Sequence, residues 1–403
     1  MALYLFRKGI RRLPGDVIKV APIPTPEVIQ GFGARERVGE ICAGAGYGSV
    51  LLVTDTTLYS LGYHQKVQAS IEAQGMRCTV FSDISSEPTI KIIESGRDAA
   101  AACKADCIVA LGGGSVLDSS KIIAATAKHP QLSVRLYLQK FAVVHHKTLP
   151  MITIPSTAGT GAEHTVGAVV KNARGVKSST VVIGLNVTEV ILDSELMVNA
   201  PRSVTAWCGI DALSHGLEGL MADVRSTEED IQKSSECVKL VLENLPKVLD
   251  SPQDIAARQK MSLAAFYGGN AINKQLAGYV HAFAHSVGGM YHIPHGEAIA
   301  FCMIPVIEAQ RGICAQKLAA LARYCGLADP EDGDDAAVDA LLSALRELLK
   351  RCGLSKGCSR IRPSDCRKLI GQIDMDSINY SPPVTFTDRE IRALLRKIRR
   401  GVF

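Results

Sequence analysis

The pattern of hydrophobic and polar positions changes in kind near residue 200. Before it, short apolar runs end at polar or glycine turns, with amphipathic stretches between them. The apolar runs cover 49–55, 78–83, 106–113, 149–156 and 188–193, and the amphipathic stretches include 60–74 and 89–102. Strands that alternate with helices in this way predict βαβ units and a mostly parallel, buried sheet.

A shorter feature interrupts this plan between the fourth and fifth runs. The segments "TVGAVVK" (165–171) and "KSSTVVIG" (177–184) flank the turn-like sequence "NARG". This arrangement predicts a β-hairpin inserted in the α/β plan.

After residue 200 the strand signals stop and apolar residues recur at helical spacing. The helical segments cover 201–222, 228–245, 254–272 and 336–352, with Pro201 at a helix start and a charged loop at 328–335. A chain of 403 residues is also too long for one ordinary core. We therefore predict an α/β domain at 1–199 followed by an all-helical domain at 200–403.

The charge balance adds little to this picture. The net charge of +5 comes mostly from two basic ends, "FRKGIRR" and "RALLRKIRR", which we interpret as solvated faces. Aromatic residues make up 5% of the chain and Trp207 is the single tryptophan, which argues against a stacking platform for nucleic acid. We find no apolar run of membrane-spanning length, and we expect neither a nucleic-acid nor a membrane partner.

Cysteine usage bears on the compartment. The twelve cysteines include no CxxC pair and several lie in apolar runs, which favours a reduced, cytoplasmic setting and disfavours a cysteine-based zinc site. The first residues lack a secretory signal pattern, although the absence of acidic residues before Asp16 leaves organellar targeting open.

Three turns point to a nucleotide. "ALGGGSVLDSSK" (110–121) follows an apolar strand and opens a helix, where backbone N–H groups can approach a phosphate. It is not a GxGxxG sequence, and by itself it is equally typical of a structural turn. "IPSTAGTGAE" (154–163) offers the hydroxyls of Thr157 and Thr160. Asp55 ends a predicted strand, where it suits either a helix N-cap or ribose hydroxyls. Together the three turns predict a dinucleotide, and Asp55 favours NAD over NADP because a carboxylate repels a 2′-phosphate.

The histidines predict a metal site. Asp211 and His215 stand four residues apart on a helical pattern, and so do His281 and His285. One carboxylate with two or three imidazoles suits Zn²⁺ or Fe²⁺. Spacing alone favours His281 and His285 as ligands. It leaves open whether the histidines of "HIPHG" (292–296), which follow a Gly-Gly break, take part.

Four of these segments resemble a known family. "GGGSVLDSSK", "PSTAGTGAE", "GIDALSHGLEG" and "YVHAFAHSVGGMYHIPHGEA" are similar, in order and separation, to motifs of the iron-containing (group III) alcohol dehydrogenases. The likeness extends from about residue 25 to 391. It implies the dehydroquinate synthase-like architecture, in which an NAD-binding α/β domain precedes a helical metal-binding and catalytic domain.

The resemblance also implies roles for individual residues. The metal ligands, for Fe²⁺ or alternatively Zn²⁺, fall on Asp211, His215, His281 and His295. His285 falls near the metal and substrate without ligating and is expected to move the substrate's proton, and His292 matches no ligand. Gly288 and Gly289 are expected to let the chain turn back toward the metal. The cofactor-binding positions are Asp55, Gly112, Gly113, Gly114, Ser115, Asp118, Thr157, Thr160 and Lys177.

Departures from the family pattern concern the substrate. Ser156 stands where Thr is commoner, Ala162-Glu163-His164 stands where many members have Ser-Glu-Val, and the pocket segment 268–278 is unusual. The resemblance therefore implies reversible hydride transfer between a small primary alcohol, or its aldehyde, and NAD in a homo-oligomeric enzyme, without specifying the alcohol. A glycerol-type polyol dehydrogenase or a dehydroquinate-synthase-like cyclase is the alternative. A non-catalytic protein that keeps the fold is disfavoured by the complete ligand set.

Overall fold

The computed structural model describes residues 25–84, 88–138, 141–144, 147–171, 177–222, 224, 226–378 and 380–401. These residues form two compact units. The α/β unit contains residues 25–157 and 161–199, and the helical unit contains residues 158–160 and 200–401.

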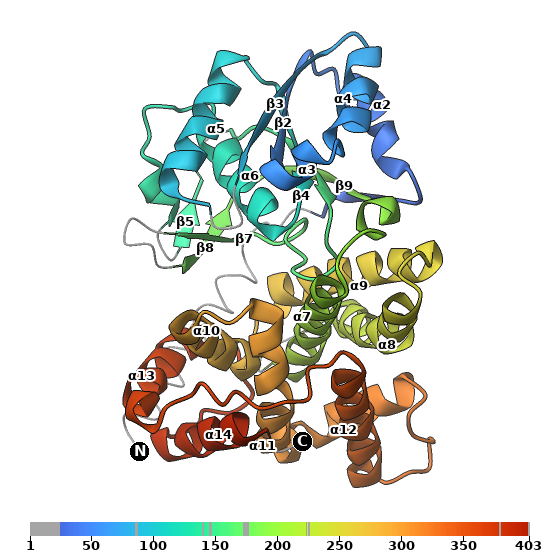
Figure 1. Ribbon diagram of the computed structural model, residues 1–403, viewed down its shortest axis with the longest axis vertical. Helices are drawn as coiled ribbons and strands as arrows, with labels where there is room; N and C mark the ends of the chain where they lie inside the picture. Colours follow the sequence, from blue (N-terminus) through green and yellow to red (C-terminus); the bar gives the residue numbers. More distant parts are fainter. Residues whose placement is uncertain are drawn as a thin grey trace. The chain divides into compact units, whose positions relative to one another are not determined.

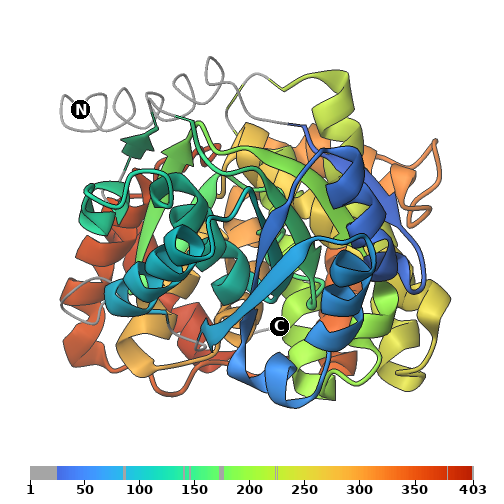
Figure 2. The ribbon, with the colours of Figure 1, turned by 90° about the horizontal axis from the view of Figure 1, so that it is seen from above.

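A six-stranded, wholly parallel sheet forms the centre of the α/β unit (Figures 1 and 2). Its strands, in spatial order, are β1 (Glu27–Gln30), β9 (Val187–Leu192), β6 (Met151–Pro155), β4 (Cys107–Gly112), β2 (Ser49–Asp55) and β3 (Arg77–Ile84). The last five confirm the strands predicted from the apolar runs. Strand β1 is an addition, which pairs with β9 at the sheet edge.

Helices cover both faces of this sheet, so the residues of β6 and β4 that point to either side are buried. On one face Val50 and Leu52 pack in a common core with α2 (Val38–Gly44) and α4 (His64–Ala73). Helices α5 (Ile90–Ala102) and α6 (Gly114–Thr126) lie on the other side of the sheet in Figure 1. The short helix α3 (Thr56–Ser60) follows β2 directly. The strands are therefore buried runs, as the sequence predicts.

The predicted hairpin is present. Strands β7 (Gly167–Lys171) and β8 (Lys177–Ile183) pair antiparallel, and their connection lies outside the described residues. A short strand that the sequence did not indicate, β5 (Phe141–Val143), pairs parallel to β8 and completes a three-stranded sheet.

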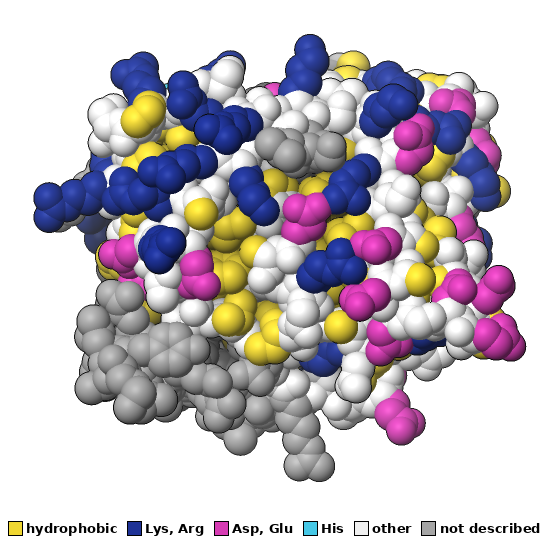
Figure 3. Space-filling view, turned by 90° about the horizontal axis from the view of Figure 1, so that it is seen from below, with side chains coloured by type: hydrophobic (Ala, Val, Ile, Leu, Met, Phe, Trp, Pro, Cys, Tyr) yellow, Lys and Arg dark blue, Asp and Glu magenta, His cyan; other side chains and the backbone are white. Residues whose placement is uncertain are grey.

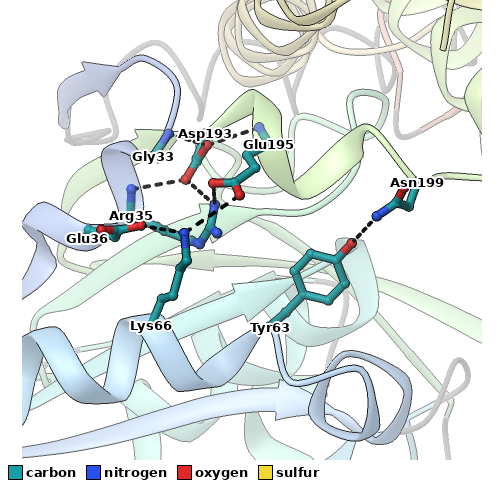
Figure 4. A network of polar contacts seen from close by, with 8 residues as sticks. All are labelled: Gly33, Arg35, Glu36, Tyr63, Lys66, Asp193, Glu195 and Asn199. Atoms are coloured by element: carbon teal, nitrogen blue, oxygen red, sulfur yellow. Dashed lines mark hydrogen bonds and ion pairs between the residues drawn. The ribbon is translucent and has the colours of Figure 1, made fainter. Parts of the chain in front are cut away.

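A polar network fixes the end of β9 (Figure 4). Asp193 follows β9 and is wholly buried, and its Oδ2 lies 2.6 Å from Nη1 of Arg35, itself 3% exposed. Its Oδ1 accepts hydrogen bonds from the backbone N–H groups of Gly33 and Glu195, each at 3.0 Å. Glu195 also pairs with Arg35 at 2.8 Å. The network ties the turn after β1 to the turn after β9.

The helical unit confirms the change in pattern at residue 200. Pro201 is the N-cap of its first helix, as predicted. Its helices are α7 (Arg202–Met221), α8 (Glu228–Asp250), α9 (Ile255–Gln275), α10 (Tyr279–Tyr291), α11 (His295–Tyr324), α12 (Asp334–Arg351), α13 (Cys366–Ser377) and α14 (Asp388–Arg400). The charged loop precedes α12, and its last two residues open that helix.

Helix α11 corrects the expectation that no apolar run has membrane-spanning length. It has 30 residues and an 18-residue window apolar enough to cross a membrane by length and composition. Of that window, 67% is buried inside the protein, and α11 packs against α7, α10 and α12. We therefore describe α11 as a core helix of this unit.

The predicted break at Gly288 and Gly289 is wrong. Helix α10 continues through both glycines to Tyr291, and the chain turns at His292, whose φ of 51° and ψ of 50° are left-handed. Glycine in a helix costs only about 1 kcal/mol relative to alanine, and the buried face of α10 offsets this. His292 is exposed, so it lies on the surface.

The basic C-terminal segment forms an amphipathic helix. Ile391, Leu394, Leu395 and Ile398 of α14 are buried in the core, while its arginines and lysine are exposed. In the view from below in Figure 3, Lys and Arg side chains gather toward the upper left. The other basic segment, 6–12, lies outside the described residues.

Candidate functional site

One face of α7 carries three buried polar side chains. Asp211, His215 and Glu218 stand at positions i, i+4 and i+7, which a helix places above one another. They are 4%, 6% and 4% exposed. Buried charged groups are retained only when other groups satisfy them.

Helices α10 and α11 bring two imidazoles to Asp211. The Oδ1 of Asp211 lies 3.7 Å from Nε2 of His281 and 3.2 Å from Nε2 of His295. These three ligand atoms all lie within 4.8 Å of one another. Two ligands about 2.1 Å from a tetrahedral ion lie roughly 3.4 Å apart, so the spacing suits one divalent cation.

Two of these atoms lack hydrogen-bond partners. Oδ1 of Asp211 and Nε2 of His281 are buried and make no hydrogen bond of acceptable geometry with a described residue. An unsatisfied buried polar atom costs about 1–3 kcal/mol. A cation coordinated by both atoms would remove this cost, so the residues fit a metal.

A close approach of backbones brings His295 into position. Gly296 is the second residue of α11, and a Cβ there would lie 2.3 Å from the carbonyl oxygen of Trp207 on α7. Only glycine permits this approach. It places the start of α11 one turn from Asp211.

His215 lies beside the group of three. Its Nε2 is 3.7 Å from Oδ1 of Asp211, and its ring stacks on that of His281 with centroids 4.8 Å apart. Burial lowers the pKa of His215 to about 4, so the imidazole is neutral, the form that binds metals. His215 is thus adjacent to the cluster, but among the described residues only Asp211, His281 and His295 have ligand atoms that all lie within 4.8 Å of one another.

The charges of the cluster are strongly coupled. Burial alone would raise the pKa of Asp211, but the imidazoles of His215 and His295 outweigh it and hold the pKa of this carboxyl well below its ordinary range. Burial alone would lower the pKa of His281, but the carboxylates of Glu218 and Asp211 raise it to about 10. Asp211 is therefore an anion, and a cation would replace the proton on His281.

His285 lies next to this cluster and has a different partner. Its Nδ1 is 2.9 Å from the hydroxyl of Tyr380, and its ring stacks on His295 at 5.0 Å. Burial, together with His295 and His281, lowers its pKa well below the ordinary value. Burial also raises the pKa of Tyr380, so its hydroxyl stays protonated. His285 is therefore a neutral imidazole bonded to a hydroxyl.

The glycine turn lies at the carboxyl end of β4. Gly112 ends that strand, and a Cβ there would lie 2.4 Å from Val116. Gly113 is the N-cap of α6, and Gly114 and Ser115 begin the helix, whose N-terminus has no side-chain cap. Backbone N–H groups at such a helix start favour an anion.

The second turn lies against the first. The backbone N–H of Ser156 donates to the carbonyl of Gly112 at 3.0 Å, and a Cβ on Gly113 would lie 3.6 Å from the side chain of Thr157. Thr157 is half-buried, and Thr160 is exposed in the segment counted with the helical unit. The structure thus brings Thr157 to the glycine turn.

Asp55 has the simpler of its two expected roles. Its Oδ1 accepts hydrogen bonds from the backbone N–H groups of Thr57 at 2.9 Å and Leu58 at 2.8 Å, so it is the N-cap of α3. Its Oδ2 accepts no hydrogen bond among the described residues. Contact with ribose stays a prediction.

Asp118 is engaged in the scaffold behind the turn. It is 8% exposed; its Oδ1 pairs with Lys121 at 3.0 Å and its Oδ2 accepts from the backbone N–H of Val169 at 2.9 Å. These bonds tie α6 to β7, and a contact with a cofactor stays a prediction. Lys177 begins β8, and its side chain is not among those described.

The unusual tripeptide 162–164 is buried. Glu163 is 1% exposed, and burial raises its pKa to about 7. His164 is 6% exposed. Neither side chain is on the protein surface.

Two residues of this site were missed from the sequence. Glu218 contacts His281, and its position seven residues after Asp211 would have placed it on the same helix face. Tyr380 reaches His285 from 95 residues away in the sequence. No local pattern indicates that contact.

Comparisons with known proteins agree with the fold and with the motifs. Residues 24–194 match the family model "Iron-containing alcohol dehydrogenase", and residues 205–399 match "Fe-containing alcohol dehydrogenase family, C-terminal". The NAD-dependent methanol dehydrogenase of Bacillus methanolicus is 30% identical over 377 residues, which cover 93% of this chain and 98% of the relative. A solved 1,3-propanediol oxidoreductase superposes with a TM-score of 0.87 at 26% identity, over 94% of this chain and 100% of that one.

A longer relative matches in part. The bifunctional aldehyde-alcohol dehydrogenase of Escherichia coli (strain K12) is 30% identical over 338 residues, which cover 77% of this chain and only 38% of the relative's length. The family models, by contrast, account for both units of the fold. The chain belongs to the iron-containing alcohol dehydrogenase family.

Proposed function

We propose that this protein is a metal-dependent alcohol dehydrogenase and aldehyde reductase that transfers hydride between a small primary alcohol and NAD. The cluster of Asp211, His281 and His295, with its two unsatisfied buried atoms, is the observation that carries the proposal. His215 would complete the ligand set. We propose Fe²⁺ as the ion and Zn²⁺ as the alternative, since one carboxylate and three imidazoles accept both.

The bound groups would supply the chemistry that side chains lack. A divalent cation acts as a Lewis acid on the oxygen of the alcohol or aldehyde, and nicotinamide accepts or returns the hydride. The name of the methanol dehydrogenase relative supports NAD as the cofactor.

The chain's own residues would bind and orient NAD and the metal ion. The N–H groups of Gly113 and Gly114 at the start of α6 would hold a phosphate, and the hydroxyl of Thr157 lies beside them. The free Oδ2 of Asp55 would accept from a ribose hydroxyl and disfavour the 2′-phosphate of NADP. The carboxylate of Asp211 would hold one of its oxygens toward the ion.

His285 would handle the proton of the hydroxyl group. Its neutral imidazole can accept the proton of the alcohol, and in the reverse direction the protonated ring would return that proton to the reduced aldehyde. The hydroxyl of Tyr380 holds Nδ1 of this ring, which leaves Nε2 as the nitrogen that would exchange the proton. We also propose a cytoplasmic homo-oligomer, supported by the free cysteines and by the family.

The test pairs metal content with turnover. We expect His281→Ala and His295→Ala to lose bound metal and NADH formation, followed at the NADH absorbance band with a panel of primary alcohols. His292→Asn is the matched control, since this histidine is exposed and asparagine tolerates its left-handed backbone. Undiminished turnover after metal is stripped from the native protein would contradict the proposal.

The same assay separates the alternatives. Glycerol as the preferred substrate would indicate a polyol dehydrogenase. A cyclase would bind NAD and metal but give no net NADH. A parallel series with NADP tests the cofactor preference.

A further inference from the structure

The carboxylate of Glu218 has three partners on one other helix. Its Oε1 accepts hydrogen bonds from the backbone N–H groups of Val280 at 2.7 Å and His281 at 3.4 Å. Its Oε2 contacts Nδ1 of the His281 ring. Glu218 is 4% exposed, so these contacts are made away from water.

Two of the partners are groups that a helix start leaves unsatisfied. The first four N–H groups of a helix have no intrahelical acceptor and carry a partial positive charge. The N-cap of α10, Gly278, provides no side-chain cap. Glu218 therefore performs from α7 the capping that α10 lacks.

The third partner is the ring of a proposed ligand. With Nδ1 held by a carboxylate, the hydrogen of the neutral ring stays on Nδ1 and the lone pair stays on Nε2. Nε2 of His281 is the atom that faces Asp211 and lacks a partner. Both the ring's orientation and its tautomer are thereby set.

The local sequence leaves room for this contact. A Cβ on Gly278 would lie 2.8 Å from Oε1 of Glu218, so a larger residue would displace the carboxylate. Gly278 and Glu218 therefore fit as a pair.

We infer that Glu218 is the positioning residue of the metal centre, in that one carboxylate fixes both the start of α10 and the coordinating nitrogen of His281. The inference rests on the proposed metal site. It does not depend on which alcohol is oxidised, and Glu218 contacts Nδ1 of His281 rather than the nitrogen that faces Asp211.

The test measures metal affinity in the full-length protein. Glu218→Gln keeps an oxygen for the backbone N–H groups of α10 but presents an amide to Nδ1, which favours the wrong tautomer. We expect its affinity for Zn²⁺, measured by chelator competition, to fall roughly 10- to 100-fold. The visible bands of the Co²⁺-loaded protein should shift as the ligand field changes.

Two further variants separate positioning from folding. Glu218→Ala should also lower the melting temperature of the metal-free protein, because α10 loses its cap. Glu297→Gln is the matched control, since Glu297 also lies in the first turn of a helix that carries a proposed ligand, and it should bind Zn²⁺ as the native protein does.

The outcomes distinguish this inference from the proposed activity. Native affinity and native Co²⁺ bands in Glu218→Gln would overturn the inference, even with full alcohol dehydrogenase activity. A native protein that binds Zn²⁺ or Co²⁺ without oxidising any alcohol would refute the activity and leave the inference standing. A native protein that binds none of Fe²⁺, Zn²⁺ and Co²⁺ would overturn both.

Discussion

Removing the carboxylate of Asp193 should destabilise the α/β unit more than any other single change in its polar network (Figure 4). Asp193→Ala deletes the 2.6 Å ion pair with Arg35. It also deletes the two 3.0 Å hydrogen bonds that Asp193 accepts from the backbone N–H groups of Gly33 and Glu195, in the turns after β1 and β9. Arg35 is 3% exposed, so water cannot replace the lost partner. Glu195, at 2.8 Å, compensates for part of the charge.

The size of the expected loss in stability follows from the burial of this ion pair. Removing one partner of a buried ion pair costs about 3–5 kcal/mol, because the other charge is left without compensation. Because the Glu195 pair with Arg35 remains in the variant, we expect the lower part of this range, about 3–4 kcal/mol. Every 1.4 kcal/mol is about tenfold in an equilibrium constant, so hydrogen exchange that requires opening of this region should accelerate roughly 10²- to 10³-fold.

Hydrogen exchange measured by mass spectrometry is the assay. Peptides that cover β1 and β9 should lose protection, and peptides from α8 in the helical unit should change far less. The control is Glu36→Ala, which removes a 2.8 Å pair with Lys66 that is about half-exposed on both sides and is expected to contribute nothing measurable. Equal protection in the two variants would show that burial does not set the strength of this network.

Three other changes test the rest of the molecule. Asp55→Ala should remove about 1 kcal/mol of helix capping and reduce the preference for NAD, measured as the ratio of kcat/KM for the two cofactors, whereas Asp55→Asn should keep the cap. Burial raises the pKa of Glu163 from 4.5 to about 7, so at pH values between these two the folded state holds one more proton than the unfolded state. The free energy of unfolding should therefore fall by about 3 kcal/mol as the pH rises through this range. Urea unfolding of Glu163→Gln should lack this loss, and an unchanged pH profile would show that another group causes it. Tyr380→Phe should lower kcat up to about tenfold by freeing His285, with an unchanged KM for NAD in steady-state kinetics.

The strands that the sequence predicts well are those with long apolar runs. The run at 49–55 matches β2 residue for residue, because its seven residues and its β-branched valines and threonine are typical of a buried strand and too short for a core helix. β1 has four residues and β5 has three. Their pairing with β9 and β8 depends on long-range contacts, which local propensity does not encode.

In the candidate site, too, local spacing predicts some residues, whereas others depend on tertiary contacts. Helical spacing identified the pairs Asp211–His215 and His281–His285, but it favoured His285 over His295 as a ligand. The family resemblance reversed that choice, and the structure brings His295, rather than His285, to within 3.2 Å of Asp211. The reason is tertiary, since the start of α11 approaches α7 closely at Gly296, a contact that no periodicity reveals.

That glycine contact also gives the protein an optical probe of its own. Trp207 is the only tryptophan in the chain, it lies one turn before Asp211, and its main chain touches Gly296 beside His295. Its indole therefore belongs to a residue one helical turn from a proposed ligand of the ion. A paramagnetic ion such as Fe²⁺ should quench this fluorescence and Zn²⁺ should not, so the light from one indole can report which ion occupies the site before any alcohol is added.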